Sequence, residues 1–410
     1  MQFEIQMDIL KTLLLAVVLL VVGQKIRDKY EFFTKYCLPS AVIGGLLFSI
    51  ITLVLYQFNI ANFTFDRTLQ TFFMNAFFAA SGCGAGLGLL KKGSKQVVIF
   101  IVLAAVLAFL QNLVAVGVGT VVGVQPLIAL MTGSIPMTGG HGNAAAFAPI
   151  AQEMGAQGAV SVAVAAATFG LVAGSIIGGP IGNRIITKKG LDKTINNGRG
   201  EALSQYELEM ASKKELPCLD KKRTTTAIFL IAISLGLGSY IFDFAKVALP
   251  NVVLPIHVMC MLAGVIVRNV YDAFNKKTDE VLYQEIDVAG DISLAVFVSM
   301  AIMSMRLWEL AQLAVPLLIL LAAQIVLVYL FATQITFRAM GKDYDAAVMA
   351  VGHVGFSTGA VPVSMTTMKT VCDKYAFSRV AFFVVPLVGG LFSNFTNAAI
   401  ITAFLNFFAN

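Results

Sequence analysis

Ten long apolar runs, separated by short polar segments, constrain the fold of this chain more than any other feature. Each run approaches or exceeds the roughly 20 residues that a helix needs to cross a bilayer, and is too long for a strand of a membrane barrel. Only 13% of the 410 residues are charged, against about 25% in soluble domains. The sequence therefore predicts an all-α integral membrane protein of ten transmembrane helices, at residues 8–23, 37–57, 71–90, 96–123, 157–186, 224–243, 250–268, 287–308, 313–338 and 376–408.

The basic residues predict how these helices are oriented. If the ten runs cross the membrane, 25 of the 29 Lys and Arg lie on one side, and Lys11, Arg67, Lys246 and Arg306 lie on the other. Loops rich in Lys and Arg stay in the cytoplasm, so both termini are expected outside it. The net charge of +6 thus reports orientation, and no nucleic-acid partner is expected.

Two further apolar segments, 126–152 and 345–368, carry clusters of glycine, serine and threonine. Broken backbone at membrane depth is tolerated only where protein or a water-filled cavity covers it. We expect each segment to be a re-entrant hairpin of two half-helices that meet inside the membrane. Full spans are the alternative, and they would change the topology.

The chain divides into two halves at a polar segment, 187–223, which is expected to be a cytoplasmic linker. Each half, 1–186 and 224–410, then holds five spans and one hairpin. An odd number of spans inverts the second half relative to the first, which predicts an inverted repeat. The order of residues agrees with this, because Leu107–Gln111 aligns with Leu320–Gln324.

The first hairpin is the principal candidate for a binding site. Unpaired backbone N–H groups at the start of a half-helix attract a carboxylate, and neighbouring hydroxyl and amide groups add donors. The candidate residues are Ser134, Thr138, Gly139, Gly140, His141, Gly142 and Asn143. A glycine-rich helix packed against its neighbours is the alternative, and His141 could bind, relay a proton or only hold the tip.

The second hairpin contributes the candidates Gly355, Ser357, Thr358 and Gly359. These residues also match the G-x-S-x-G pattern of serine hydrolases, so an intramembrane hydrolase using Ser357 with His353 or His141 is the alternative from another functional class. The pattern is short, the chain has 35 glycines, and no strand precedes the serine. We therefore expect a transporter and not an enzyme.

Polar residues inside the expected spans are candidates for binding a coupling cation. Asp291 lies near the start of the eighth span, and Asn394 and Asn397 lie in the middle of the tenth. Sodium prefers oxygen ligands of this kind, so these three residues are the sodium candidates. For Asp291 the alternatives are binding of the amino group of a substrate and a carboxylate at the membrane interface. For the two asparagines the alternative is helix–helix hydrogen bonding.

Two other sequence patterns bear on helix packing and on the role of the cysteines. Gly170, Gly174 and Gly178 recur every four residues, which makes one smooth helix face and predicts close helix packing. The five cysteines are scattered without a CxxC pair, so neither a disulfide framework nor a structural zinc site is indicated.

Four blocks of sequence together suggest a family. GSIPMTGGHGNAAAF, ATFGLVAGSIIGGPIGNR, IDVAGDISLAVFVSMAIMSMRLWEL and GHVGFSTGAVPVSM, in this order, resemble the bacterial sodium/glutamate symporters over nearly the whole chain. One position departs from the family pattern, because Ser357 stands where a more glycine-rich GHxGFGxGATP loop is expected.

The resemblance implies a homodimer in the bacterial inner membrane, with inverted five-helix repeats and two re-entrant loops. It also implies sodium-coupled import of L-glutamate, in which a transport domain moves against a scaffold in an elevator-type cycle. The departure at Ser357 leaves a sodium-coupled transporter of di- or tricarboxylates as the alternative within this class. Sodium is the expected coupling ion, and no other cofactor is expected.

Overall fold

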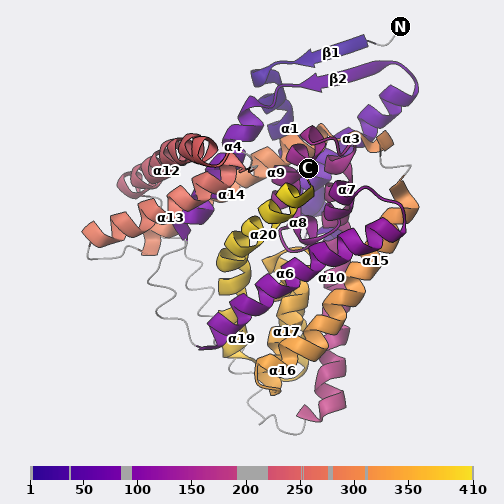
Figure 1. Ribbon diagram of the computed structural model, residues 1–410, viewed down its shortest axis with the longest axis vertical. Coiled ribbons are helices and arrows are strands. Elements are labelled where there is room, and N and C mark those ends of the chain that lie inside the picture. The colour runs from indigo at the N-terminus through magenta and orange to yellow at the C-terminus, as the bar shows by residue number, and fades with distance from the viewer. Residues whose placement is uncertain are drawn as a thin grey trace.

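The computed structural model describes residues 3–36, 38–84, 95–191, 220–250, 252, 254–275, 280–309 and 313–408 (Figure 1). Most of the predicted linker 187–223 lies outside these residues, as do Cys37 and Cys218. The three described cysteines, Cys83, Cys260 and Cys372, are buried free thiols.

Nine helices in the described residues are long and apolar enough to cross a membrane. Each coincides with a predicted span. They are α1 (Ile9–Lys29), α3 (Ser40–Gln57), α6 (Lys95–Val121), α10 (Ala159–Lys189), α12 (Lys221–Ala248), α13 (Ile256–Phe274), α14 (Glu280–Met303), the continuous run of α15 (Ala314–Leu330), η4 (Phe331–Thr336) and α16 (Phe337–Ala339), and the run of α19 (Arg379–Leu387), η5 (Val388–Phe392) and α20 (Ser393–Phe408). The remaining predicted span, 71–90, overlaps α4 (Thr68–Gly84), which has 17 residues and reaches the edge of the described region.

The two predicted break regions contain only short helices. The first holds α7 (Pro126–Leu130), α8 (Ser134–Met137) and α9 (Gly140–Glu153), and the second holds α17 (Tyr344–Ser357) and α18 (Val361–Lys374). α9, α17 and α18 have 14 residues each, which corresponds to about 21 Å at the usual rise per residue. That length falls short of the roughly 30 Å of a hydrocarbon core, so none of these helices spans it alone.

Two short strands depart from the prediction of helices throughout. β1 (Phe3–Met7) and β2 (Ala61–Phe65) pair in parallel, with Phe3 opposite Ala61. They lie at one end of the molecule, beside the N-terminus (Figure 1). The pair is closed by α1, the short α2 (Glu31–Lys35) and α3, which together form the crossover that parallel strands require. Five-residue strands next to long apolar runs leave too weak a pattern for the sequence to reveal them.

Side-chain caps define where several helices begin. Asp8, Asp343 and Ser378 accept the backbone N–H three residues on, at the starts of α1, α17 and α19. Such caps satisfy a donor that the helix itself leaves unpaired. The backbone and side chain of Lys11 hydrogen-bond Asp8, and this lowers the pKa of the Asp8 carboxyl below its ordinary value.

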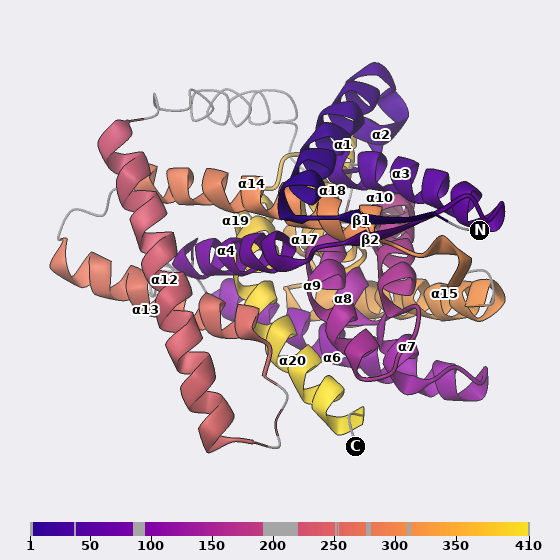
Figure 2. The same ribbon diagram turned by 90° about the horizontal axis from the view of Figure 1, so that it is seen from above.

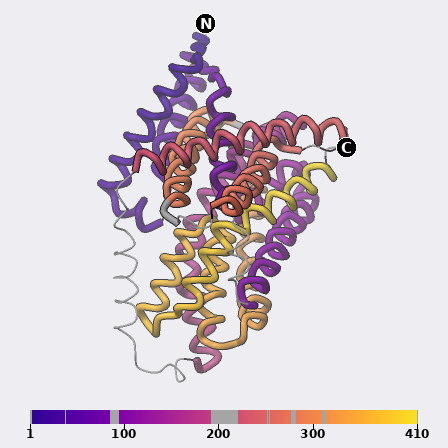
Figure 3. Tube along the Cα trace, turned by 90° about the vertical axis from the view of Figure 1, so that its left-hand side faces the viewer, coloured from indigo at the N-terminus to yellow at the C-terminus, as the bar shows by residue number. Residues whose placement is uncertain are grey.

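The helices form two sets, and each half of the chain contributes to both. The first helix set is α1, α3, α4, α12, α13 and α14, which pack against one another. The second helix set comprises α6 to α10 and α15 to α20, including both hairpins. Figures 1 and 3 show the first set near the N-terminal end and the second set extending to the opposite end. Figure 2 shows α12 and α13 at one edge of the molecule.

The glycine face of α10 packs against the second hairpin, which confirms the predicted close packing. A Cβ at Gly170 would lie 2.1 Å from the Thr358 carbonyl oxygen, and one at Gly174 would lie 2.0 Å from Thr358 Oγ1. At Gly178 the nearest atom would be Thr367 Cγ2, at 2.7 Å. Only glycine allows α10 to approach the hairpin this closely.

Candidate functional site

The tips of the two hairpins meet at a pair of glycines. Gly140, which begins α9, has φ of +60°, a conformation that side chains other than glycine rarely adopt. A Cβ at Gly140 would lie 2.6 Å from the carbonyl oxygen of Gly359, in the turn between α17 and α18. The two breaks are 219 residues apart in sequence, yet the fold brings their backbones into contact.

Two amide side chains bind the first hairpin at Ser134. The backbone N–H of Ser134 donates to Oδ1 of Asn112 on α6 at 2.8 Å. Nδ2 of Asn397 on α20 donates to the Ser134 carbonyl oxygen at 3.0 Å. The Ser134 N–H lies in the first turn of α8, where the helix itself offers no acceptor, and Asn112 supplies one. The Ser134 carbonyl oxygen already accepts the backbone N–H of Thr138 at 3.1 Å, and Asn397 adds a further hydrogen bond to it.

Gln111 on α6 connects the two hairpins directly. Its Oε1 accepts from Thr138 Oγ1 of the first hairpin at 2.6 Å, and its Nε2 donates to the Ser357 carbonyl oxygen of the second at 2.8 Å. Nε2 of Gln324 on α15 donates to the backbone oxygen of Gln111 at 2.8 Å. Both glutamines are fully buried, so this network is shielded from competing water.

Several buried polar atoms around this network have no hydrogen-bond partner among the described residues. They are Ser134 Oγ, Asn112 Nδ2, Asn143 Nδ2, Asn397 Oδ1 and Gln324 Oε1. An unsatisfied buried polar group costs about 1–3 kcal/mol, and native proteins hold few of them. Donors and acceptors gathered at two helix breaks have the chemistry of a site for a small polar solute.

The hydroxyl groups of the second hairpin point back into their own helix. Ser357 Oγ donates to the His353 carbonyl oxygen at 2.5 Å, and Thr358 Oγ1 donates to the Val354 carbonyl oxygen at 2.8 Å. A serine nucleophile needs a base within hydrogen-bond reach, but the acceptor here is a backbone carbonyl and not an imidazole. This geometry gives no support to the hydrolase alternative.

The two candidate histidines lie in different environments. His141 Nε2 lies 3.0 Å from Thr168 Oγ1 on α10. Because the Thr168 hydroxyl donates its proton to the Val164 carbonyl oxygen, His141 Nε2 is the donor in this pair. His353 is fully buried, stacks on the ring of Phe356, and has its Nδ1 2.9 Å from Thr336 Oγ1. These contacts give both histidines a role in holding the hairpins.

The other predicted glycines and Asn143 pack tightly at the tips. A Cβ at Gly139 would lie 2.1 Å from Asn143 Nδ2, and a Cβ at Gly355 would lie 2.4 Å from Ser364 Cα. Gly142 is less confined, since its nearest contact would be Leu294 Cδ1 of α14 at 3.4 Å. Gly142 therefore marks the place where the first hairpin faces the first helix set.

The three sodium candidates come from both helix sets. Asn397 contacts the first hairpin through Ser134. Asn394, one turn earlier on α20, donates weakly to Ser81 Oγ of α4 at 3.5 Å, and Asp291 is exposed on α14. The described residues hold no group of three or more His, Cys, Asp or Glu side chains arranged for a metal ion. A sodium site here would have to use amide, hydroxyl and carbonyl oxygens as well.

The site residues predicted from the sequence do not include Gln111, Asn112 or Gln324. All three are buried amides in helices α6 and α15, which are otherwise apolar. Polar side chains within membrane helices mark functional positions, and that signal was present in the sequence. In the sequence, these buried glutamines indicated only that Gln111 and Gln324 are equivalent positions of a repeat.

Comparison with known proteins identifies the family of this chain. Residues 5–377 match the family described as "Sodium/glutamate symporter". The chain is 36% identical over 392 residues to the sodium/glutamate symporter of Haemophilus influenzae, covering 95% of each chain. It is 35% identical over 404 residues to the sodium/glutamate symporter of Escherichia coli, covering 97% of this chain and 98% of the relative. The chain therefore belongs to the sodium/glutamate symporter family.

Proposed function

We propose that this protein imports L-glutamate across the bacterial inner membrane, coupled to the entry of sodium. The observation that carries the proposal is the meeting of two hairpin tips around Gln111, with unpartnered buried polar atoms beside them. A solute bound at these tips would touch both halves of the chain. Family membership supplies the substrate and the coupling ion.

Recognition of the substrate rests on neutral donors. Ser134 Oγ, Asn112 Nδ2 and Asn143 Nδ2 are available to a carboxylate, and Ser357 and Thr358 shape the opposite tip. The proposed substrate-binding residues remain Ser134, Thr138, Gly139, Gly140, His141, Gly142, Asn143, Gly355, Ser357, Thr358 and Gly359, to which the structure leads us to add Gln111 and Asn112. Backbone and amide donors of this kind bind an anion without a compensating basic side chain.

The proposed cycle is an elevator, in which the second helix set carries the site past the first. Both hairpins belong to the second set, and their tips are held by helices of that same set. Residues at the boundary, such as Ala145 and Val164 against Phe297 and Ala301, are apolar and can slide. The first set is the proposed scaffold and the proposed contact surface of a homodimer, which light scattering in detergent would detect as a mass of two chains.

The proposed topology has ten spans, two re-entrant hairpins, cytoplasmic basic loops and both termini outside. In a variant without native cysteines, a cysteine at Lys246 should react with an impermeant maleimide in intact cells. A cysteine at Lys188 should react only after the cells are opened. Both positions are exposed, at the ends of α12 and α10. In the proposed topology α12 is the only span between these positions, so labelling of both from outside would mean that α12 does not cross the membrane.

Asp291, Asn394 and Asn397 remain the proposed sodium ligands, and Asp291 gives the sharpest test. We expect Asp291→Asn to raise the sodium concentration for half-maximal uptake about tenfold, with a smaller change for glutamate, because a carboxylate contributes more to cation binding than an amide does. Sodium titrations of initial uptake rates measure this. If only the affinity for glutamate falls, Asp291 instead faces the amino group of the substrate.

Uptake of radiolabelled glutamate into proteoliposomes tests the function itself. Accumulation should require an inward sodium gradient, and unlabelled L-glutamate should compete better than malate or citrate. Stronger competition by malate or citrate would assign a di- or tricarboxylate as substrate. Covalent labelling of Ser357 by a fluorophosphonate, without any uptake, would refute the transporter.

A further inference from the structure

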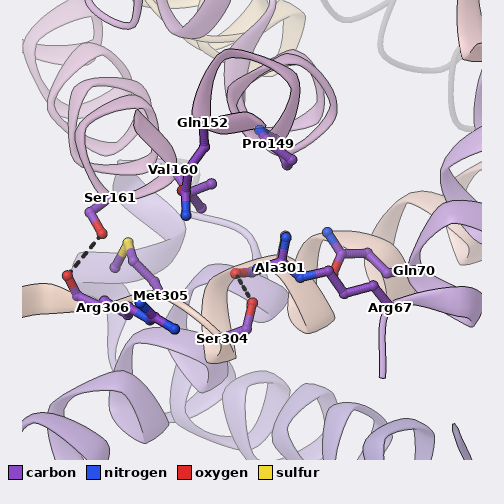
Figure 4. A pocket seen from close by; sticks show the side chains of 10 residues that line it. All are labelled: Arg67, Gln70, Pro149, Gln152, Val160, Ser161, Ala301, Ser304, Met305 and Arg306. Carbon is purple, nitrogen blue, oxygen red and sulfur yellow. Dashed lines mark hydrogen bonds between the residues drawn. The ribbon is translucent and has the colours of Figure 1, made fainter. Parts of the chain in front are cut away.

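The two helix sets meet at a polar contact and, elsewhere, at an apolar contact beside the second hairpin. The polar contact is a small pocket whose lining includes Arg67 and Gln70 of the first set and Ser161 of the second (Figure 4). There the hydroxyl of Ser161 donates to the Arg306 carbonyl oxygen at 3.0 Å. Most of the lining side chains are polar, so this contact contributes little of the apolar burial that stabilises packed elements.

The apolar contact begins in the connection between α1 and α3. We name residues 26–36 the strap; they comprise the end of α1, Tyr30 and the short helix α2. The strap has two faces, because successive residues of a helix point about 100° apart. Phe32 is 55% exposed, whereas Phe33 and Tyr36 are partly buried and pack against a cluster of apolar side chains.

This apolar cluster joins the first helix set to the second hairpin. Its four central side chains are each at most 8% exposed. In Figure 2, α10 and α18 lie just below α1 and α2. The central residues are Leu38 and Ile43, at the start of α3, together with Leu171 of α10 and Val363 of α18, and Ile26, Phe33, Tyr36 and Ala360 pack around them.

The cluster lies against the tip of the second hairpin. A Cβ at Gly359 would lie 2.6 Å from Leu171 Cδ2, and Ala360, the next residue, packs on the same cluster. No side chain caps the start of α18 at Ala360, whereas two amides bind the first hairpin at Ser134. Apolar packing therefore has a larger part in holding the start of α18 than it has at Ser134.

We propose that the strap is a latch, which holds the second hairpin closed against α10 while the two helix sets have this relative position. This inference rests on the proposed elevator cycle. Movement of the second set would carry Leu171, Ala360 and Val363 away from the strap, because the strap packs with α1 in the first set. The hairpin would then lose its apolar cover and become free to open. The position of the second set would thus decide when the hairpin opens.

The labelling rate of a buried cysteine tests the latch. Val363 is fully buried, so Val363→Cys, in a background without native cysteines, should react with an impermeant maleimide only when the hairpin opens. We expect Phe33→Ala to raise the rate of this reaction about tenfold, because truncating a packed aromatic ring favours local opening. Membrane vesicles of both orientations are labelled, so the result does not depend on the proposed topology.

Two matched variants control for position and for side-chain chemistry. Phe32→Ala truncates the same ring at the exposed neighbouring position and should leave the labelling rate unchanged. Phe33→Leu keeps an apolar side chain in the cluster and should keep most of the protection. A labelling rate that Phe33→Ala leaves unchanged would refute the latch, as would an equal rise in Phe32→Ala. If Phe33→Ala fails to insert, Tyr36→Ala is judged by the same criteria.

Two further measurements separate the possible failures. Val164 of α10 is also fully buried, in an apolar cluster with Phe297 of α14, so Val164→Cys reports separation of the two helix sets. If Phe33→Ala accelerates labelling equally at Val164→Cys and Val363→Cys, the strap holds the sets together and is not a latch on the hairpin. Absence of sodium-dependent glutamate uptake by the wild type would refute the proposed function. If the wild type transports and Phe33→Ala leaves labelling unchanged, only the latch fails.

Discussion

Gly140→Val is expected to lose at least about 90% of glutamate uptake, because strained backbone and a collision at one position together exceed 1–3 kcal/mol. The left-handed backbone at Gly140 disfavours any side chain. A Cβ there would also lie 2.6 Å from the Gly359 carbonyl oxygen and would push the two hairpins apart. Gly359→Val should have a similar effect, since its Cβ would lie 2.6 Å from Leu171 Cδ2 and 3.0 Å from Leu171 Cα. Uptake is measured in proteoliposomes at equal protein content.

Gly117→Val is the matched control for this pair. Gly117 is an exposed residue of α6, and a Cβ there meets nothing within 4 Å. This variant should transport at nearly the rate of the wild type, and all three should insert into the membrane to a similar extent. Near-normal uptake by both Gly140→Val and Gly359→Val would remove the hairpin tips from the site.

Gln111→Leu should reduce uptake about tenfold to a hundredfold, since it removes two buried hydrogen bonds and leaves their partners unsatisfied at about 1–3 kcal/mol each. The hydroxyl of Thr138 and the carbonyl of Ser357 would lose the side chain that links them. Because those groups belong to different hairpins, half-saturating concentrations should rise for glutamate and sodium together. Kinetic uptake assays with each varied in turn measure both quantities.

Two variants test whether Gln111 acts through its position between the hairpins. Gln324→Leu removes only the bond to the Gln111 backbone oxygen and should have a smaller effect. Leu113→Ala alters an exposed side chain two residues along α6 and should leave uptake unchanged. If Gln111→Leu transports normally, the link between the hairpins is not part of the binding site.

The spans could be predicted from the sequence because bilayer thickness dictates helix length. The predicted runs at 96–123 and 157–186 coincide closely with α6 and α10, and the glycine clusters marked the breaks at α8 and α17. The predicted end of the first span was less accurate, because the span was predicted at 8–23 and α1 continues to Lys29. Amphipathic ends such as Gln24–Lys29 extend a helix beyond its apolar core, and a hydropathy pattern does not register them.

The contacts within the site could not be predicted in the same way. The alignment placed Gln111 over Gln324, yet nothing in a linear pattern says that the second side chain bonds the backbone of the first. The same holds for Asn397 and Ser134, which are 263 residues apart. Such pairs depend on how helices cross in three dimensions. Local chemistry predicts which residues are polar and buried, but tertiary packing decides which of them meet.

The absence of ionised side chains from the hairpin tips has an electrical consequence. Residues 131–146 and 352–362 contain no Asp, Glu, Lys or Arg, and Gln111, Asn112, Gln324 and Asn397 are neutral amides. In the proposed cycle Asp291 stays behind on α14 of the first helix set, so the empty hairpin tips cross the membrane without carrying charge. Each unit charge is worth about 2.3 kcal/mol per 100 mV, and glutamate with two sodium ions would carry one positive charge inward. Membrane voltage would then drive the loaded crossing and leave the empty return unaffected.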